Sequence, residues 1–441
     1  MNFVPATSKE EKEMLATIGI SRIDQLFSGI TKEHLLKRDL NLPAGLSEIE
    51  LKREIESMAG KNRIYKTSFR GAGAYRHFIP SVIKHLVMRS EFYTAYTPYQ
   101  AERSQGMLQS IYEYQTMICR LTGMDLANAS MYDGASALAE AALMATRITE
   151  KKQILLSGAV HPEYQATVKT YCHANDIKVM SLPFKAGITD LKELKILLNN
   201  SVGGVIIQNP NFFGSFEEIK IIAQLVHQVG AILIINVVEP TSLALIKSPG
   251  EQGADIVVGD GQSFGLSLNF GGPYIGFMAT KEEYMRRIPG RLVGMTKDTQ
   301  GRRAFVLTLQ SREQHIRREK ATSNICTNSA LCALTVLIYL ATLGPKLRQV
   351  AELSMTKAHY LAKKLAQLPD IKLVNSQRFY NEFVVQVKNS EKVLQKLRNQ
   401  GIEGGVDLGN YYPQLKNHLL FCTTELNTKE EMDKAVKILK I

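Results

Sequence analysis

Cysteine is scarce in this sequence, and none of it stands in a pattern that would cross-link the chain or hold a metal ion. The five cysteines are odd in number and widely spread, and no two have the C-x-x-C spacing of a thiolate zinc site. The nine histidines are equally scattered. We therefore expect neither a disulfide framework nor a metal site, and this use of cysteine fits the cytoplasm.

Long apolar segments are also lacking. The longest nearly unbroken one, at residues 330–343, stops at Gly344-Pro345 and falls short of the roughly 20 residues that a membrane-spanning helix needs. The first residues carry no apolar stretch of signal-peptide length before the charged run at 8–13. We expect a buried helix at 330–343, no membrane segment and no export signal.

No repeat of fixed period and no low-complexity stretch interrupts the 441 residues. With 45% hydrophobic and 22% charged residues, the composition is that of a folded globular chain, which excludes disordered and collagen-like proteins. The length predicts two or three domains.

Basic residues outnumber acidic ones by 54 to 42, a formal net charge of +12. Such a balance is found in nucleic-acid-binding proteins, but most of these basic residues are dispersed at helix-surface spacing and no recognition motif accompanies them. Attraction to an acidic protein partner explains the charge equally well. We expect no nucleic-acid binding.

The pattern along the chain predicts three regions. Residues 1–90 read as short helices, one of which begins at Ser47 with a capping box to Glu50 and ends near Gly60. Residues 91–330 alternate helices with short β-branched runs, which is typical of a parallel sheet covered on both faces. Helices are expected at 102–121, 162–174, 190–198 and 217–227, and strands at 153–156, 177–182, 204–208, 231–235, 255–258 and 274–278.

The last region, residues 331–441, changes character. A helical pattern from 328 to 368 is interrupted at Gly344-Pro345, and short strands and helices follow it to the end of the sequence. The fold class is therefore α/β, with an N-terminal helical region, a large α/β domain and a small C-terminal α+β domain.

Ligands in open α/β sheets bind at the carboxyl ends of strands and at helix N-termini, and three segments qualify. Asp133, Gly134 and Ser136 open an alanine-rich helix, as a phosphate cradle or as an ordinary capped helix. His161 follows a strand, where it could lie over a planar cofactor, act as a base, or simply cap the next helix. The glycine-rich stretch 255–276 suits close backbone approach but lacks the spacing of a dinucleotide fingerprint.

Several longer motifs match a known family. They are Tyr96-Thr97-Pro98-Tyr99-Gln100, Ser104-Gln105-Gly106, Val160-His161-Pro162-Glu163-Tyr164, the stretch 271–277 (GGPYIGF) and the stretch 312–327 (REQHIRREKATSNICT). In these words the sequence resembles the glycine cleavage system P-protein family over roughly residues 5–440. Within that family it looks like the separate first subunit of the two-chain bacterial enzyme.

The resemblance implies the fold-type I architecture of pyridoxal phosphate enzymes, similar to aspartate aminotransferase. It also implies a reaction in which glycine is decarboxylated, with the cofactor as electron sink, and its aminomethyl group passes to the lipoyl arm of the H protein. The activity that the resemblance implies is that of glycine dehydrogenase (aminomethyl-transferring), an oxidoreductase of glycine catabolism.

This chemistry needs a lysine that binds the cofactor, and the corresponding stretch 255–280 contains none. By the resemblance, Ser263 stands at the lysine position and Gln262 at the preceding histidine, while Glu239 is the only plausible acid for the cofactor's ring nitrogen. Lys247 and Lys281 flank the stretch, but neither position suits a cofactor-binding lysine. We expect the isolated chain to be inactive and the cofactor to reside in a lysine-bearing second subunit, with two copies of each chain.

Two motifs remain with alternatives open. Tyr96, Tyr99 and Gln100 lie on a proline-fixed bend, and the tyrosines either pack in the core or reach the partner's active site. The basic run 312–320 is a solvated face, a subunit contact or a docking patch for an acidic lipoyl carrier. Its candidate residues are Arg312, His315, Arg317, Arg318 and Lys320.

The sequence thus leaves two main hypotheses of function. In the first, the chain is a subunit of a working decarboxylase. In the second, it is a non-catalytic pseudo-enzyme that only stabilises or regulates its partner. An independent pyridoxal phosphate enzyme that uses an unexpected lysine is a third reading.

Overall fold

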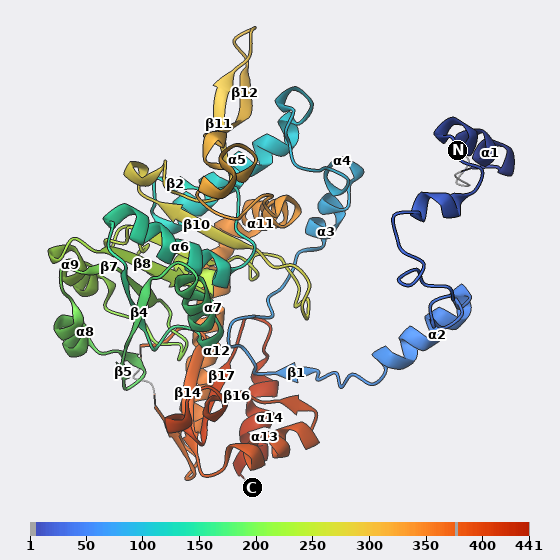
Figure 1. Ribbon diagram of the computed structural model, residues 1–441. Helices are drawn as coiled ribbons and strands as arrows, with labels where there is room; N and C mark the ends of the chain where they lie inside the picture. Colours follow the sequence, from blue (N-terminus) through green and yellow to red (C-terminus); the bar gives the residue numbers. More distant parts are fainter. Residues whose placement is uncertain (1–5, 375–377, 441) are drawn as a thin grey trace. The chain divides into compact units, whose positions relative to one another are not determined.

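The computed structural model describes residues 6–374 and 378–440 (Figure 1). The chain divides into two compact units between Ile64 and Tyr65. Residues 1–5, on which the prediction of no export signal partly rests, lie outside the described part. The three predicted regions, with boundaries at 90 and 330, stay predictions.

The first unit consists of short, well-capped helices without a core. It contains α1 (Ser8–Ile18), the 3₁₀ segment η1 (Ile23–Phe27) and α2 (Glu48–Ala59). The α2 helix begins with the predicted capping box, since the Ser47 hydroxyl accepts from the Glu50 N–H while the Glu50 carboxylate accepts from the Ser47 N–H. Among residues 6–64 only Leu15 is buried.

The second unit is built around a seven-stranded sheet. Five neighbouring strands run parallel, as predicted, but β10 runs antiparallel to β9, so the sheet is mixed and not purely parallel. The alternation of apolar residues carries no direction, and the short link at 261–275 brings no crossover helix that would return β10 parallel to β9. In spatial order the strands are β2 (Leu126–Ala127), β10 (Gly276–Thr280), β9 (Ile256–Asp260), β8 (Ile232–Val237), β7 (Val202–Gln208), β3 (Gln153–Ser157) and β4 (Lys178–Leu182).

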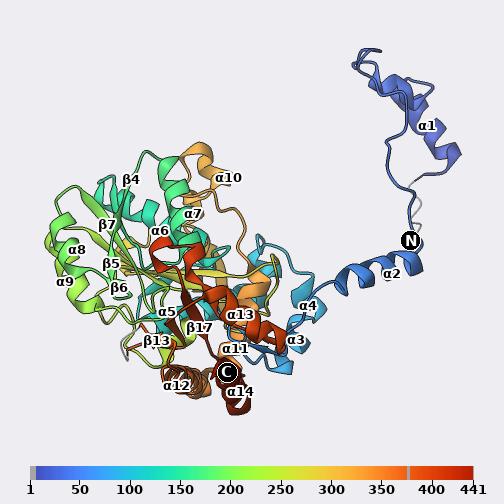
Figure 2. The ribbon, with the colours of Figure 1, turned by 90° about the horizontal axis from the view of Figure 1, so that it is seen from below.

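Helices cover both faces of this sheet (Figure 2). Successive residues of the buried strands pack on opposite sides: Leu233 and Ile235 belong to one apolar cluster, and Ile234 to the other. One face carries α6 (Gly134–Thr149) and α7 (Pro162–His173), and the other carries α5 (Gln105–Thr122), α8 (Leu191–Leu197), α9 (Ile219–Gln228) and α11 (Ala330–Leu343).

The sequence reading missed a hairpin formed by β11 (Leu292–Lys297) and β12 (Arg303–Thr308), which stands on α5 (Figure 1). Two glutamines of α5 hold it as a neighbouring strand would. The side-chain amide of Gln115 pairs with both backbone groups of Val293, and that of Gln105 with both of Phe305, at 2.9–3.0 Å. Shorter elements of the second unit are α3 (Ser81–Val87), α4 (Ser90–Tyr93), α10 (Gln314–Arg317), β5 (Phe184–Lys185) and β6 (Ile188–Thr189).

The C-terminal part is a four-stranded antiparallel sheet with helices, as predicted. The chain just after residue 65 joins it, because β1 (Thr67–Ser68) pairs in parallel with β15. Its sheet order is β13 (Ile371–Leu373), β14 (Glu382–Val387), β17 (His418–Cys422) and β16 (Val406–Asp407), accompanied by β15 (Ile402–Glu403), α12 (Leu347–Leu365), α13 (Ser390–Asn399) and α14 (Lys429–Lys440).

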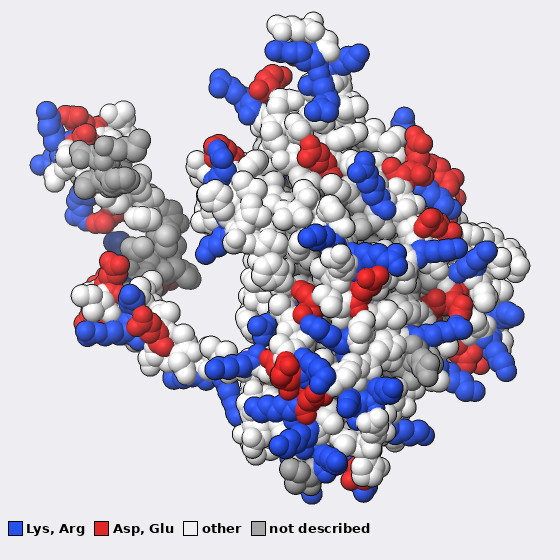
Figure 3. All heavy atoms as spheres, turned by 180° about the vertical axis from the view of Figure 1, so that it is seen from behind, with Lys and Arg blue, Asp and Glu red and all other residues white. Residues whose placement is uncertain are grey.

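The apolar run at 330–343 forms the expected buried helix. By length and composition alone the continuous stretch 330–365 could cross a membrane. However, the side chains of residues 333–340 are buried against the sheet, so this is a core helix. On the face seen in Figure 3, basic side chains lie scattered with acidic ones between them, as the dispersed sequence pattern predicts.

Candidate functional site

The structure brings the predicted lysine position and the predicted acid into direct contact. Ser263 follows β9 and Glu239 follows β8, so both lie at the carboxyl edge of the sheet. Both are buried, and the Ser263 hydroxyl donates to Oε2 of Glu239 at 2.8 Å. In the cofactor site that the resemblance implies, the residues at these two positions would contact different atoms of the same pyridoxal phosphate molecule.

Every acceptor position of the Glu239 carboxylate is taken by the chain itself. Oε2 also accepts from Nε2 of His77 at 3.1 Å. Oε1 accepts from the backbone N–H of Thr241 at 3.1 Å and from its hydroxyl at 2.5 Å. With two donors on each oxygen, Glu239 has no lone pair left for a ring nitrogen.

His77 is a buried cation between two carboxylates. Its Nδ1 lies 2.7 Å from Oε2 of Glu425, opposite the contact of Nε2 with Glu239, and the imidazole side chain is 2% exposed. Burial alone would lower the pKa of His77, but the charge and hydrogen bond of Glu239, followed by those of Glu425, outweigh it and raise the pKa to about 10. His77 is therefore an imidazolium at neutral pH and donates to both partners.

The segment that carries His77 enters the site through residues 71–73. The Ala72 N–H donates to Oε1 of Glu382 at 2.7 Å, and the Tyr75 hydroxyl donates to Oε2 at 2.8 Å. Burial raises the pKa of Glu382 to about 7 despite these two bonds. A Cβ on Gly71 would clash with Oε1 of Glu382, and Gly73 has a φ of +105°, so the approach requires glycine at both positions.

Gln262 and His161 both hold this segment. The Gln262 side-chain amide pairs with the backbone N–H and C=O of Tyr75, at 2.8 and 2.9 Å. His161 lies with its Nε2 3.0 Å from the carbonyl oxygen of Ala72, while its Nδ1 accepts from the N–H of Glu163 at the start of α7. Burial lowers the pKa of His161, so the ring is neutral. Of the three alternatives for His161, these contacts are those of a residue that caps the next helix.

Carboxylates occupy the N-terminus of α6, where the phosphate cradle was considered. Asp133 accepts from the Ser136 N–H at 2.7 Å, and Asp260 accepts from the Gly134 N–H at 3.1 Å. Burial raises the pKa of Asp260 to about 7, although its hydrogen bonds with the Gln262 and Gly134 N–H groups oppose the shift. The helix end thus has two acids of its own beside it, which would repel a phosphate.

The residues of this site do not fit pyridoxal phosphate. The cofactor needs an amine, a free acceptor for its ring nitrogen and an anion cradle. Here the amine is replaced by Ser263, the acceptor Glu239 is saturated, and the cradle is beside Asp133 and Asp260. In the described part of the chain, no group of three His, Cys, Asp or Glu side chains could hold a metal ion either.

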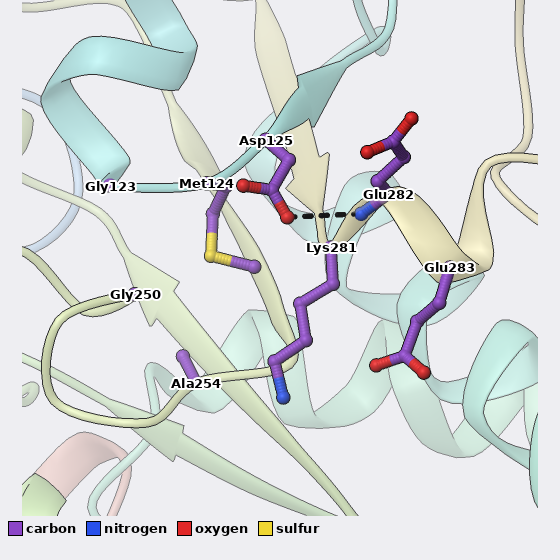
Figure 4. Close-up of a pocket in the computed structure, with 8 residues that line it drawn as sticks. All are labelled: Gly123, Met124, Asp125, Gly250, Ala254, Lys281, Glu282 and Glu283. Atoms are coloured by element: carbon purple, nitrogen blue, oxygen red, sulfur yellow. Dashed lines mark hydrogen bonds between the residues drawn. The ribbon is translucent and has the colours of Figure 1, made fainter.

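The two flanking lysines lie elsewhere. Lys247 is exposed in a loop. Lys281 follows β10, which is antiparallel to β9, so it lies at the edge where β9 begins, opposite the edge of Ser263. Its ammonium pairs with Asp255, beside a cavity of about 370 Å³ in which Asp125 accepts from the Glu282 N–H (Figure 4).

The tyrosine motif is at the surface and not in the core. Tyr96 and Tyr99 are 75% and 57% exposed, and Gln100 is exposed beside them. Core packing, one of the two alternatives for the tyrosines, is therefore wrong. Tyr99 is held in place: its hydroxyl accepts from Nη2 of Arg291 at 3.2 Å, and the same guanidinium lies 5.1 Å from the ring centre. Arg291 is itself buried against Glu313.

The basic run contains one arginine that is partly buried and four basic residues that are exposed. Arg312 donates to the carbonyl oxygens of Ile288, Gly290 and Leu309, so it holds the local backbone together. The side chain of Arg317 donates to the carbonyl oxygen of Ser311. His315, Arg317, Arg318 and Lys320 are exposed, which is compatible with all three alternatives for the run: a solvated face, a subunit contact or a docking patch.

Sequence reasoning missed the residues that fill the site: Tyr75, His77, Glu382 and Glu425. Each meets its partner across more than 160 positions of sequence, and no short motif records such a pairing. The usable signal was the pair of glycines at 71 and 73, which marks close backbone approach.

The sequence is similar to named proteins over its whole length. The probable glycine dehydrogenase (decarboxylating) subunit 1 of Moorella thermoacetica is 52% identical over 442 residues, covering 100% of this chain and 99% of that protein. The protein of the same name from Carboxydothermus hydrogenoformans is 51% identical with the same coverage.

Solved structures agree. The crystal structure of glycine decarboxylase (P-protein) of the glycine cleavage system, in inhibitor-bound form, superposes with a TM-score of 0.91 at 44% identity and covers 100% of this chain and 99% of that one. A NifS-like protein, at 13% identity and a TM-score of 0.63 over 85% of this chain and 98% of its own, shares the fold alone. The family model of the glycine cleavage system P-protein matches residues 1–439, and the chain therefore belongs to that family.

Proposed function

We propose that this chain is the non-lysine subunit of a two-chain glycine cleavage P protein, a glycine dehydrogenase (decarboxylating). The family and the names of its full-length relatives support this assignment. The single observation that carries the division of labour is the hydrogen bond between Ser263 and Glu239, at the two positions where a catalytic chain would hold the cofactor.

In this proposal the pyridoxal phosphate resides in the second, lysine-bearing subunit, and two copies of each chain form the cytoplasmic enzyme. Glycine loses carbon dioxide there, and the aminomethyl group passes to the lipoyl arm of the H protein. The cofactor supplies the electron sink for decarboxylation. This chain supplies surface and support to the partner.

Tyr96, Tyr99 and Gln100 are the residues through which this chain would touch the chemistry. Both tyrosines are exposed on a bend before α5, and the buried Arg291 fixes the hydroxyl of Tyr99. Because the hydroxyl of Tyr99 is already held in place, little conformational entropy is lost when it binds. It therefore suits hydrogen bonding to a group in the partner's site. His315, Arg317, Arg318 and Lys320 offer positive charge to an acidic carrier.

The test is reconstitution of glycine-dependent carbon dioxide exchange with lipoylated H protein. We expect no exchange from this chain alone and exchange from a mixture with the lysine-bearing subunit. Exchange by this chain alone would overturn the assignment. Full exchange by the second subunit without this chain would favour the pseudo-enzyme alternative.

The location of the cofactor has a separate test. After incubation with pyridoxal phosphate and borohydride reduction, we expect no lysine of this chain to be labelled stoichiometrically, and we expect the same of the Ser263→Lys variant. Labelling of one lysine of the wild type, such as Lys247 or Lys281, would show that the chain holds the cofactor itself.

A further inference from the structure

The first unit presents apolar side chains that nothing within that unit covers. Among residues 6–64, sixteen large hydrophobic side chains are each at least 40% exposed. The α1 helix places Met14 and Ile18 on one face, and α2 places Leu51, Ile55 and Met58 on one face at helical spacing. These are amphipathic helices whose apolar sides lack a core.

Such helices need a surface to pack on. The α1 and α2 helices have 11 and 12 residues, lengths at which an isolated helix is marginal in water. Capping boxes stabilise their N-termini, but most helical stability in proteins comes from packing of the apolar face. The sequence therefore specifies where the helices begin. Their main stabilising contact must come from a surface outside this unit.

From these observations we infer that residues 6–64 form an arm that packs on the lysine-bearing second subunit and buries these side chains there. The inference rests on the proposed function, which supplies the partner. None of the family motifs lies in this region. In this inference the arm holds the two subunits together.

The exposed area favours a permanent partner. Sixteen half-exposed aliphatic or aromatic side chains amount to roughly 1,000 Å² of apolar surface, beyond the few hundred Å² usual on a monomer and above the roughly 800 Å² per partner of a standard interface. Obligate interfaces are the more hydrophobic class, whereas transient encounters are small and polar. A subunit fits this surface better than a carrier protein that must leave in every turnover.

Charge points the same way. Residues 1–64 contain ten Lys or Arg and ten Asp or Glu, so the formal net charge of +12 belongs entirely to residues 65–441. The arm therefore offers no net charge to steer an acidic partner. The described residues beyond 64 also have only sixteen exposed large hydrophobic side chains, spread over a unit several times longer.

The experiment compares two variants of the full chain, each co-expressed with the lysine-bearing subunit. Leu51→Gln/Ile55→Gln removes two apolar side chains from α2. The matched control, Lys52→Gln/Glu56→Gln, alters the polar side of the same helix and leaves net charge unchanged. Affinity is measured by titration of one purified subunit with the other, and mass by size exclusion with light scattering.

We expect the first variant to bind the second subunit at least tenfold more weakly and the control to bind within twofold of wild type. Equal binding by the first variant and wild type would overturn the inference. So would a wild-type homodimer that the variant abolishes, or a lower melting temperature of the isolated variant, since these place the arm on a second copy or on its own chain.

Failure of the proposed function gives a different result. If the wild-type chain does not bind the lysine-bearing subunit at all, the subunit assignment is wrong. If wild type binds and the apolar variant binds equally well, only the role of the arm is wrong. Hydrogen exchange of residues 48–59, expected to slow in the complex of the wild type, provides a readout that does not depend on the substitutions.

Discussion

The buried network around Glu239 and the arm at residues 6–64 differ in how their side chains find partners. In the network, the carboxylate of Glu239, at a position implied to hold a cofactor, is satisfied by the chain's own His77, Ser263 and Thr241. In the arm, apolar groups are left without a partner inside their unit. A buried polar group without a hydrogen-bond partner lowers the stability of the fold. Exposed apolar side chains, in contrast, can remain in solvent until a second chain covers them.

The largest expected effect is in the buried network around Glu239. The variant His77→Ala leaves Glu239 and Glu425 without their shared cation, and removal of one partner from a buried pair costs about 3–5 kcal/mol. Urea unfolding of the variant should show this loss of unfolding free energy. His173→Ala, at an exposed histidine of α7, is the control and should change it by less than about 0.5 kcal/mol. A loss below about 1 kcal/mol for His77→Ala would mean that the pairing of His77 with the two carboxylates does not stabilise this part of the fold.

The second effect is a pH dependence of stability. Because the folded pKa of His77 is about 10, above its ordinary value of 6.5, its stabilisation is complete below pH 6.5 and is lost as pH rises through 10. We expect the unfolding free energy to fall by a few kcal/mol between pH 7 and pH 10. The same measurement on His77→Gln isolates this residue. Parallel pH profiles for variant and wild type would contradict the assignment of the charge to His77.

The third effect concerns activity. If Tyr96 and Tyr99 reach the partner's site, Tyr96→Phe or Tyr99→Phe should reduce glycine-dependent exchange by about tenfold, the equivalent of roughly 1.4 kcal/mol in the transition state. Assembly and melting temperature should be nearly unchanged, since both side chains are exposed. Tyr93→Phe, on the same surface, is the control. Wild-type exchange in both variants would restrict these residues to scaffolding.

The smallest expected effect is in the arm. Leu42 is 72% exposed in the arm, so Leu42→Ser should change the unfolding free energy of the isolated chain by less than about 0.5 kcal/mol. The comparison is made by urea unfolding in parallel with His77→Ala. A cost of 2 kcal/mol or more would mean that the arm is already packed in the free chain.

The elements that local rules specify were predictable. The capping box at Ser47 and the left-handed Gly123 after α5 fixed helix ends, and β-branched runs fixed the strands. The direction of β10 was not predictable, because a strand reads alike in both directions. At the site, the resemblance to the family identified Ser263, Gln262 and Glu239. The histidine that neutralises Glu239 comes from a distant segment, and only the three-dimensional structure pairs them.

The saturation of Glu239 also determines what a lysine at position 263 would do. Such a lysine would place a second buried cation beside His77, while the acid between them already has all its donors. The substitution would be unfavourable until the segment 71–77 and the acids near α6 had changed as well. Each of those changes breaks a satisfied buried contact before any cofactor could compensate. A substitution at position 263 alone would therefore not provide a cofactor site in this chain.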